Sequence, residues 1–142
     1  MAKKDFIIII AGSRGFEDYD LLQQKCDKIV DKIKDTRNII IRSGGAKGAD
    51  KFGEKYARKR GFKVQRFIPD WRPNGVYDNS AGHKRNREMA DGNDEYPAEA
   101  HALIAFWDFK SNGTKGMIDY AKKKGMQVRK INYTKYEDEV YP

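Results

Sequence analysis

The chain contains a single cysteine, Cys26, so it can form no internal disulfide and cannot build a metal site from several thiolates. One cysteine suits a reducing compartment, and we expect a cytoplasmic protein. Long apolar runs are also lacking: the longest, residues 6–11, is far shorter than the roughly 20 residues that span a bilayer. The first residues lack the apolar core of a signal peptide, and we therefore expect no membrane contact.

Positive charge is what the chain has in quantity. Its 29 Lys and Arg residues exceed its 21 Asp and Glu residues, which gives a net charge of +8 over 142 residues. Such an excess favours polyanionic partners such as nucleotides, nucleic acid or phosphorylated metabolites. Hydrophobic residues still make up 39% of the chain, enough to bury one core. We expect one domain over residues 1–132, followed by a C-terminal tail or a last short element over residues 133–142.

Short, strongly apolar segments alternate with amphipathic ones, which is typical of a parallel sheet covered by helices on both faces. The pattern predicts an α/β fold, a single three-layer domain with a five-stranded parallel sheet. The expected strands are 6–11, 38–43, 62–68, 101–107 and 126–132, and the expected helices are about 18–34, 47–60, 82–91 and 113–124. Cys26 shares the apolar face of the first helix, so we expect a core residue and not a nucleophile.

Glycines cluster where the expected strands lead into helices. In a doubly wound sheet, ligands bind beyond the carboxyl ends of the strands, and glycine there lets backbone N–H groups approach an anion. The alternative is that these segments are merely tight turns. The sequence predicts a ligand-binding site that contains Gly12, Ser13, Arg14, Ser43, Gly44, Gly45, Lys47, Gly48, Asp50, Arg85, Arg87, Asn112, Gly113, Thr114 and Lys115.

The arginines belong to this set because a guanidinium group grips phosphate oxygens in a bidentate manner. For Arg87 the alternative is a solvated basic face. Trp71 lies in the long connecting segment 69–82, where it either stacks on a base or packs its loop onto the core.

Two common phosphate signatures are absent. Residues 44–50 (GGAKGAD) and 111–117 (SNGTKGM) do not supply the G-x-x-x-x-G-K-[ST] pattern of a P-loop. Residues 11–16 (AGSRGF) do not fit the G-x-G-x-x-G fingerprint of dinucleotide-binding proteins. The sequence therefore disfavours a kinase, a GTPase or an ordinary NAD dehydrogenase, and we expect no cofactor and no metal.

Four ordered motifs cover nearly the whole chain: AGSRGFEDYDLL (11–22), SGGAKGADKFGEKYA (43–57), HKRNREMAD (83–91) and ALIAFWDFKSNGTKGMIDYAKKKG (102–125). Together they resemble the YspA-like branch of the SLOG superfamily, which is related to the DNA-processing protein DprA and to the LOG phosphoribohydrolases. The resemblance implies a Rossmann-like fold, a nucleotide or nucleotide-derived ligand, a homo-oligomer, and a bacterial or phage source.

LOG enzymes split the N-glycosidic bond of a nucleoside monophosphate with an arginine of an R-x-x-x-M segment and a glutamate of a G-T-x-x-E motif. Arg85 and Met89 match the first motif. Met117 stands where the second motif has its glutamate, and a thioether can neither stabilise an oxocarbenium-like transition state nor activate water. Asp119 lies about 200° further around the expected helix and is a poor substitute.

These observations favour binding of a nucleotide or nucleotide-derived ligand, for sensing, sequestration or processing. A nucleotide hydrolase that cleaves an N-glycosidic or phosphate bond is the first alternative, and its candidate catalytic residues are Arg85, Asp108 and Asp50. For Asp50 the alternative is compensation of a helix dipole; for Asp108 it is binding of a ribose hydroxyl.

DprA-like binding of single-stranded DNA is the second alternative. It rests on the basic stretch Lys55, Arg58, Lys59, Arg60, Lys63 and Arg66. Nonspecific strand binding usually adds stacking aromatics, whereas Phe62 and Phe67 in this stretch are expected to lie in the strand core.

Overall fold

The computed structural model describes residues 2–134 and 137–141. Along the chain the elements are β1 (Lys4–Gly12), α1 (Tyr19–Val30), β2 (Arg37–Ser43), α2 (Ala49–Arg60), β3 (Lys63–Arg66), the 3-10 turn η1 (Pro73–Gly75), α3 (Ala81–Asp91), β4 (Ala102–Trp107), α4 (Asn112–Lys123), β5 (Gln127–Asn132) and β6 (Glu137–Tyr141). None of the helices in this described part is long and apolar enough to cross a membrane.

The strands form one sheet in the order β3-β2-β1-β4-β5-β6. β1 to β5 pair in parallel, which confirms the expected α/β fold with five parallel strands. β6 is antiparallel to β5, from Val128 opposite Tyr141 to Asn132 opposite Glu137. This strand lies in the segment for which we expected a tail or a last short element, and residues 135, 136 and 142 lie outside the described residues.

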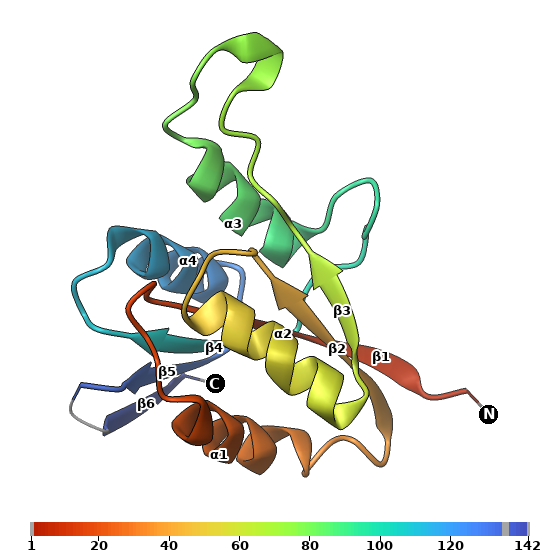
Figure 1. The fold of residues 1–142 in the computed structure, drawn as a ribbon. Coiled ribbons are helices and arrows are strands. Elements are labelled where there is room, and N and C mark those ends of the chain that lie inside the picture. The colour runs from red at the N-terminus through yellow and green to blue at the C-terminus, as the bar shows by residue number, and fades with distance from the viewer. Residues whose placement is uncertain (1, 135–136, 142) are drawn as a thin grey trace.

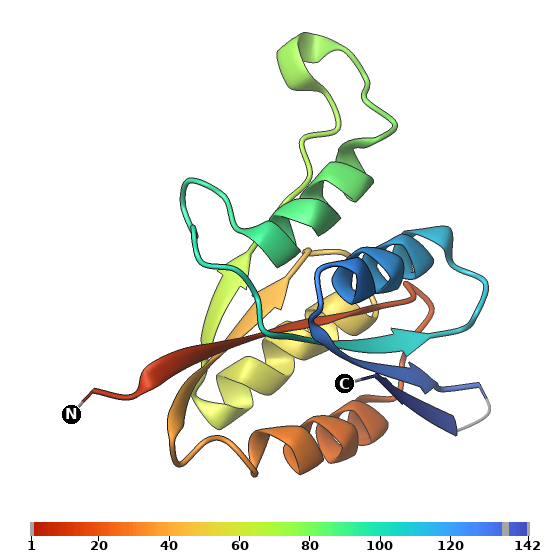
Figure 2. The ribbon, with the colours of Figure 1, turned by 180° about the vertical axis from the view of Figure 1, so that it is seen from behind.

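Helices cover both faces of the sheet, with α1 and α2 on one side and α3 and α4 on the other (Figures 1 and 2). Side chains of β1 alternate between the two cores: Ile8 and Ile10 pack with α1 and α2, whereas Ile7 and Ile9 pack with α3 and α4. Cys26, on the inner face of α1, is fully buried, as predicted, and burial raises the pKa of its thiol.

Local signals account for the ends of the helices. Asp18 caps α1, because its Oδ1 accepts a hydrogen bond of 3.0 Å from the N–H of Leu21. α1 ends at Val30, four residues earlier than expected, because residues 31–36 form turns. α2 ends at a left-handed C-cap, Gly61, as its sequence indicated.

The direction in which successive strands are added to the sheet reverses between β1 and β4. From β1 the chain runs outward through β2 to β3, then returns to β4 on the other side of β1 and continues to β5. Helices therefore lie on opposite faces on either side of this switch point, which leaves a crevice at the carboxyl ends of β1 and β4. The loops that follow these two strands form the edges of that crevice.

Candidate functional site

A pocket of about 400 Å³ opens at the carboxyl ends of β1 and β4. Its walls come from residues 11–15 at the end of β1 and just after it, the start of α2, the segment before α3, one side of α3, and the first turns of α4. The volume lies in the range of small-molecule sites, and the position is where doubly wound sheets bind ligands.

The first turn of α4 provides the most favourable place for an anion. Its N-cap residue Ser111 does not cap the helix, because the Ser111 hydroxyl donates to Asp108 Oδ1 at 3.0 Å and also lies 3.2 Å from Ser13 Oγ. Gly113 and Thr114, both in this first turn, line the pocket. A helix N-terminus of this kind favours a negative charge by up to about 2 kcal/mol.

Asp108 shapes the loop before α4. Its Oδ1 accepts hydrogen bonds of 2.8 Å from the N–H groups of Lys110 and Ser111. Burial works against ionisation, but these N–H groups and the hydroxyls of Ser111 and Ser13 outweigh it, so the pKa of Asp108 is lowered. Asp108, a candidate catalytic residue of the hydrolase alternative, is thus engaged with its own loop.

The glycine-rich loop before α2 satisfies several of its own N–H groups. Gly45 donates to Ser43 Oγ at 3.0 Å, and Ala46 donates to Asp50 Oδ2 at 3.2 Å. Gly48 has a φ of +84°, and a Cβ on it would lie 2.4 Å from the carbonyl oxygen of Ser13. This glycine therefore lets the loop after β1 pass directly against the start of α2.

Two charged side chains meet behind this loop. The Asp50 carboxyl is 5% exposed and lines the pocket; burial raises its pKa to about 6, against the opposing effect of the Arg85 guanidinium. Arg85 donates through Nη1 to the carbonyl of Gly44 and through Nε to Asn86 Oδ1 at 2.9 Å. Asn86 in turn donates to the carbonyl of Gly113 at 3.2 Å. This chain of contacts fixes α3 relative to both helix starts.

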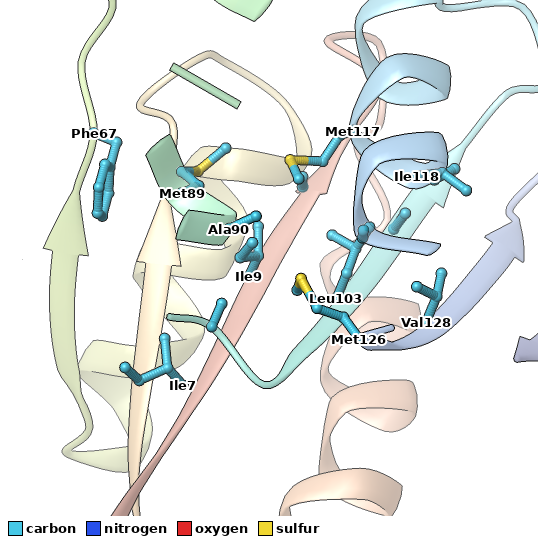
Figure 3. Close-up of a cluster of buried hydrophobic side chains, with 14 of the residues drawn as sticks. Ile7, Ile9, Phe67, Met89, Ala90, Leu103, Met117, Ile118, Met126 and Val128 are labelled. Carbon is cyan, nitrogen blue, oxygen red and sulfur yellow. The ribbon is translucent and has the colours of Figure 1, made fainter. Parts of the chain in front are cut away.

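Two methionines form an apolar floor. Met89 of α3 and Met117 of α4 are each 1% exposed, and both line the pocket. Figure 3 shows them next to each other beyond Ile9. Met117, which replaces the LOG glutamate, is therefore at the pocket, whereas Asp119 is exposed and pairs with Lys115 at 2.8 Å.

The structure brings together about half of the residues that the sequence predicted for the site. Seven of them line the pocket: Gly12, Ser13, Arg14, Asp50, Arg85, Gly113 and Thr114. The pocket formed by the described residues is not lined by the others, which are Ser43, Gly44, Gly45, Lys47, Gly48, Arg87, Asp108, Asn112 and Lys115. Lys47, Arg87 and Lys115 are exposed on the surface.

Asn86 is a site residue that sequence reasoning missed. Asn86 lies between Arg85 and Arg87, and only the charged residues of that segment were predicted to bind a ligand. The spacing of the sequence does indicate its burial: Asn86 precedes Met89 and Ala90 by three and four residues, so it lies on the apolar face of α3. A polar residue on a buried face requires hydrogen-bond partners, and here it joins α3 to α4.

Two of the six basic residues in the stretch of α2 and β3 pair with carboxylates of the protein itself. Arg60 donates to Asp27 and, at 2.9 Å, to Asp31, while Arg66 pairs with Glu54 at 3.3 Å. Phe67 is buried, and Phe62 is partly buried against the core. Neither ring therefore offers the open stacking surface that nonspecific strand binding uses.

Residues 6–73, from β1 to the start of η1, match the family described as YAcAr: YspA, cpYpsA-related SLOG family. A search of curated proteins gave no match to the chain. The matched segment includes the loop after β1 and the glycine-rich start of α2, both of which contribute to the pocket. The match to this family suggests a nucleotide-related ligand in general. Residues 6–73 of the chain are thus similar to the YspA, cpYpsA-related SLOG family.

Proposed function

We propose that the protein binds a nucleotide or nucleotide-derived ligand in the pocket at the carboxyl ends of β1 and β4. One observation carries the proposal: the first turn of α4, the loop at residues 12–15 and the Arg85 side chain line the same pocket. The phosphate of the ligand lies against the N–H groups of Gly113 and Thr114, where the helix dipole favours an anion.

The charges around the pocket support an anionic ligand. Arg14 and Arg85 both line it, and each guanidinium group can bind two phosphate oxygens. Asp50 is the opposing charge, but it is turned toward Ala46 N–H and is influenced most strongly, after burial, by Arg85. The positive charges at the pocket, two guanidinium groups and one helix N-terminus, therefore outnumber the one negative charge of Asp50, which is hydrogen-bonded within the protein.

Isothermal titration calorimetry with ribose 5-phosphate and a panel of nucleoside monophosphates tests the proposal. We expect Arg14→Gln to weaken binding roughly tenfold, the effect of losing one charge-assisted contact. Lys115→Gln removes the same charge from an exposed side chain outside the pocket and serves as the matched control. Equal losses in both variants would indicate general electrostatic attraction and would contradict a site at this pocket.

Hydrolysis of the bound nucleotide is a second candidate function, favoured by one observation. Asp50 is a buried carboxyl in the pocket whose pKa of about 6 suits proton transfer near neutral pH. Incubation with the same panel, followed by chromatographic detection of free base or phosphate, tests this candidate. Turnover that is lost in Asp50→Asn, with ligand binding retained, would support catalysis; binding without any product would restrict the protein to a binding role.

A further inference from the structure

The segment between β3 and α3 extends away from the sheet beyond α3 (Figures 1 and 2). We call residues 68–80 the arm. In the described part of the chain, the arm carries four of the five large hydrophobic side chains that are exposed: Ile68, Trp71, Val76 and Tyr77. Exposed apolar groups gathered in one segment mark a place of contact with another molecule.

Of these four side chains, only Trp71 lines the pocket. Its indole stacks on the ring of Tyr77, with ring centroids 6.2 Å apart and planes 11° from parallel. The Arg72 guanidinium lies 5.5 Å from the centre of the Tyr77 ring. The carbonyl of Trp71 also accepts a hydrogen bond of 2.7 Å from the N–H of Asp78, which closes the arm. Trp71 is thus held in a column of planar groups, yet 38% of it remains exposed.

The indole also leans on the start of α3. Its Cη2 atom lies 3.3 Å from the position that a Cβ on Gly82 would occupy. Two polar side chains line the pocket near this point: Asn79, at the base of the arm, and His83, in the first turn of α3. His83 Nδ1 lies 3.4 Å from the Cβ position of Gly116, so its ring is close to α4. An aromatic surface and two hydrogen-bonding side chains therefore occupy one end of the pocket.

We propose that this end of the pocket is a base-binding subsite, in which Trp71 stacks on the base and Asn79 and His83 bind its edge. The inference rests on the proposed function, and it specifies the ligand as one that carries an aromatic base. Every base has a π-face, and stacking on an aromatic side chain contributes about 1–3 kcal/mol per base. The phosphate and the base then occupy different parts of one pocket, which have different chemistry.

Three variants separate the contribution of the base to binding from that of the phosphate: Trp71→Ala, Trp71→Phe and Val76→Ala. Val76→Ala is the matched control, because Val76 is 69% exposed on the same arm and does not line the pocket. Each variant is titrated with AMP, CMP, adenosine and ribose 5-phosphate by calorimetry, and circular dichroism verifies that it is folded. We expect Trp71→Ala to weaken AMP binding roughly 5- to 100-fold and to leave ribose 5-phosphate binding unchanged, with Trp71→Phe in between.

Fluorescence provides a second readout. The chain has two tryptophans, and Trp107 is buried, so Trp107→Phe leaves Trp71 as the reporter. We expect AMP to quench its emission and ribose 5-phosphate to leave it unchanged.

The outcomes distinguish this inference from the proposed function. If AMP and ribose 5-phosphate bind equally well, or if Trp71→Ala weakens both to the same extent, the base subsite is wrong while the phosphate site stands. If adenosine binds as well as AMP and its binding depends on Trp71, the base subsite stands and the phosphate site is wrong. If the protein binds none of these compounds, both proposals are overturned.

Discussion

Asp50 and Arg85 lie against the same glycine. Asp50 Oδ2 and Arg85 Nη1 are 2.8 Å and 2.5 Å from the position that a Cβ on Gly44 would occupy. Arg85 also donates a hydrogen bond to the carbonyl of Gly44. The absent side chain of Gly44 thus creates the space in which the buried Asp50 carboxyl and the partly buried Arg85 guanidinium approach each other from different helices.

Gly44→Ala should therefore disturb the site and the fold together. The added methyl group must displace Arg85 or Asp50, and we expect a loss of about 1–3 kcal/mol in the free energy of unfolding, as for other overpacked positions. Gly15→Ala is the control, because a Cβ there would have no neighbour within 4 Å. Urea denaturation measures both variants, and equal stability of the two would show that the Arg85 contact yields without cost.

Asp50→Asn should stabilise the protein, and the gain should depend on pH. Burial raises the pKa of Asp50 to about 6 in the folded state, from 3.8 in its absence. The folded state therefore holds this proton more tightly than the unfolded chain does, so the cost of ionising Asp50 is absent at low pH, grows as pH rises between these values, and is complete above about pH 6. We expect a gain of about 3 kcal/mol at about pH 7.5 and about half of it at about pH 5.

Urea denaturation at both pH values measures this gain. The amide oxygen of the asparagine can still accept the Ala46 N–H, so the local fold is retained. Asp35→Asn, at an exposed position in a turn, should change stability by less than about 0.5 kcal/mol at either pH. A gain for Asp50→Asn that is constant with pH would show that ionisation of Asp50 is not its source.

Arg42→Met should cost much more stability than loss of a surface arginine. Arg42 is fully buried, and burial lowers its pKa to about 10. Its guanidinium donates hydrogen bonds to four acceptors from distant parts of the chain: Gln65 Oε1 and the carbonyls of Met89, Tyr96 and Ala98. Buried acceptors left without a donor cost about 1–3 kcal/mol each, so we expect a loss of at least about 3 kcal/mol.

Arg58→Ala removes an exposed arginine from α2 and is the control for this loss. It should change stability by less than about 0.5 kcal/mol in the same denaturation experiment. A loss below about 1 kcal/mol for Arg42→Met would mean that water reaches the carbonyls which Arg42 now binds.

The sequence predicted the five parallel strands and the four helices because their signals are local. A run such as Ile7–Ile10 is apolar at every position, which suits a strand buried on both faces. The burial of Cys26 and the C-cap at Gly61 could likewise be predicted, since helix periodicity and a C-cap glycine depend on a few neighbouring residues. The end of α1 was not, because residues 31–36 carry no strong stop signal.

Residue types and spacing by themselves determined the fold class, the two buried faces of the sheet and the edge at which the glycine-rich loops gather. Only the tertiary structure decided what each polar group in those loops contacts. Asp108 turns onto its own loop, Ala46 N–H donates to Asp50, and Trp71 reaches the pocket from the arm. The physical reason is that a secondary structure follows from short-range pattern, whereas a hydrogen bond or a stacking contact depends on atoms that folding brings together from distant parts of the chain.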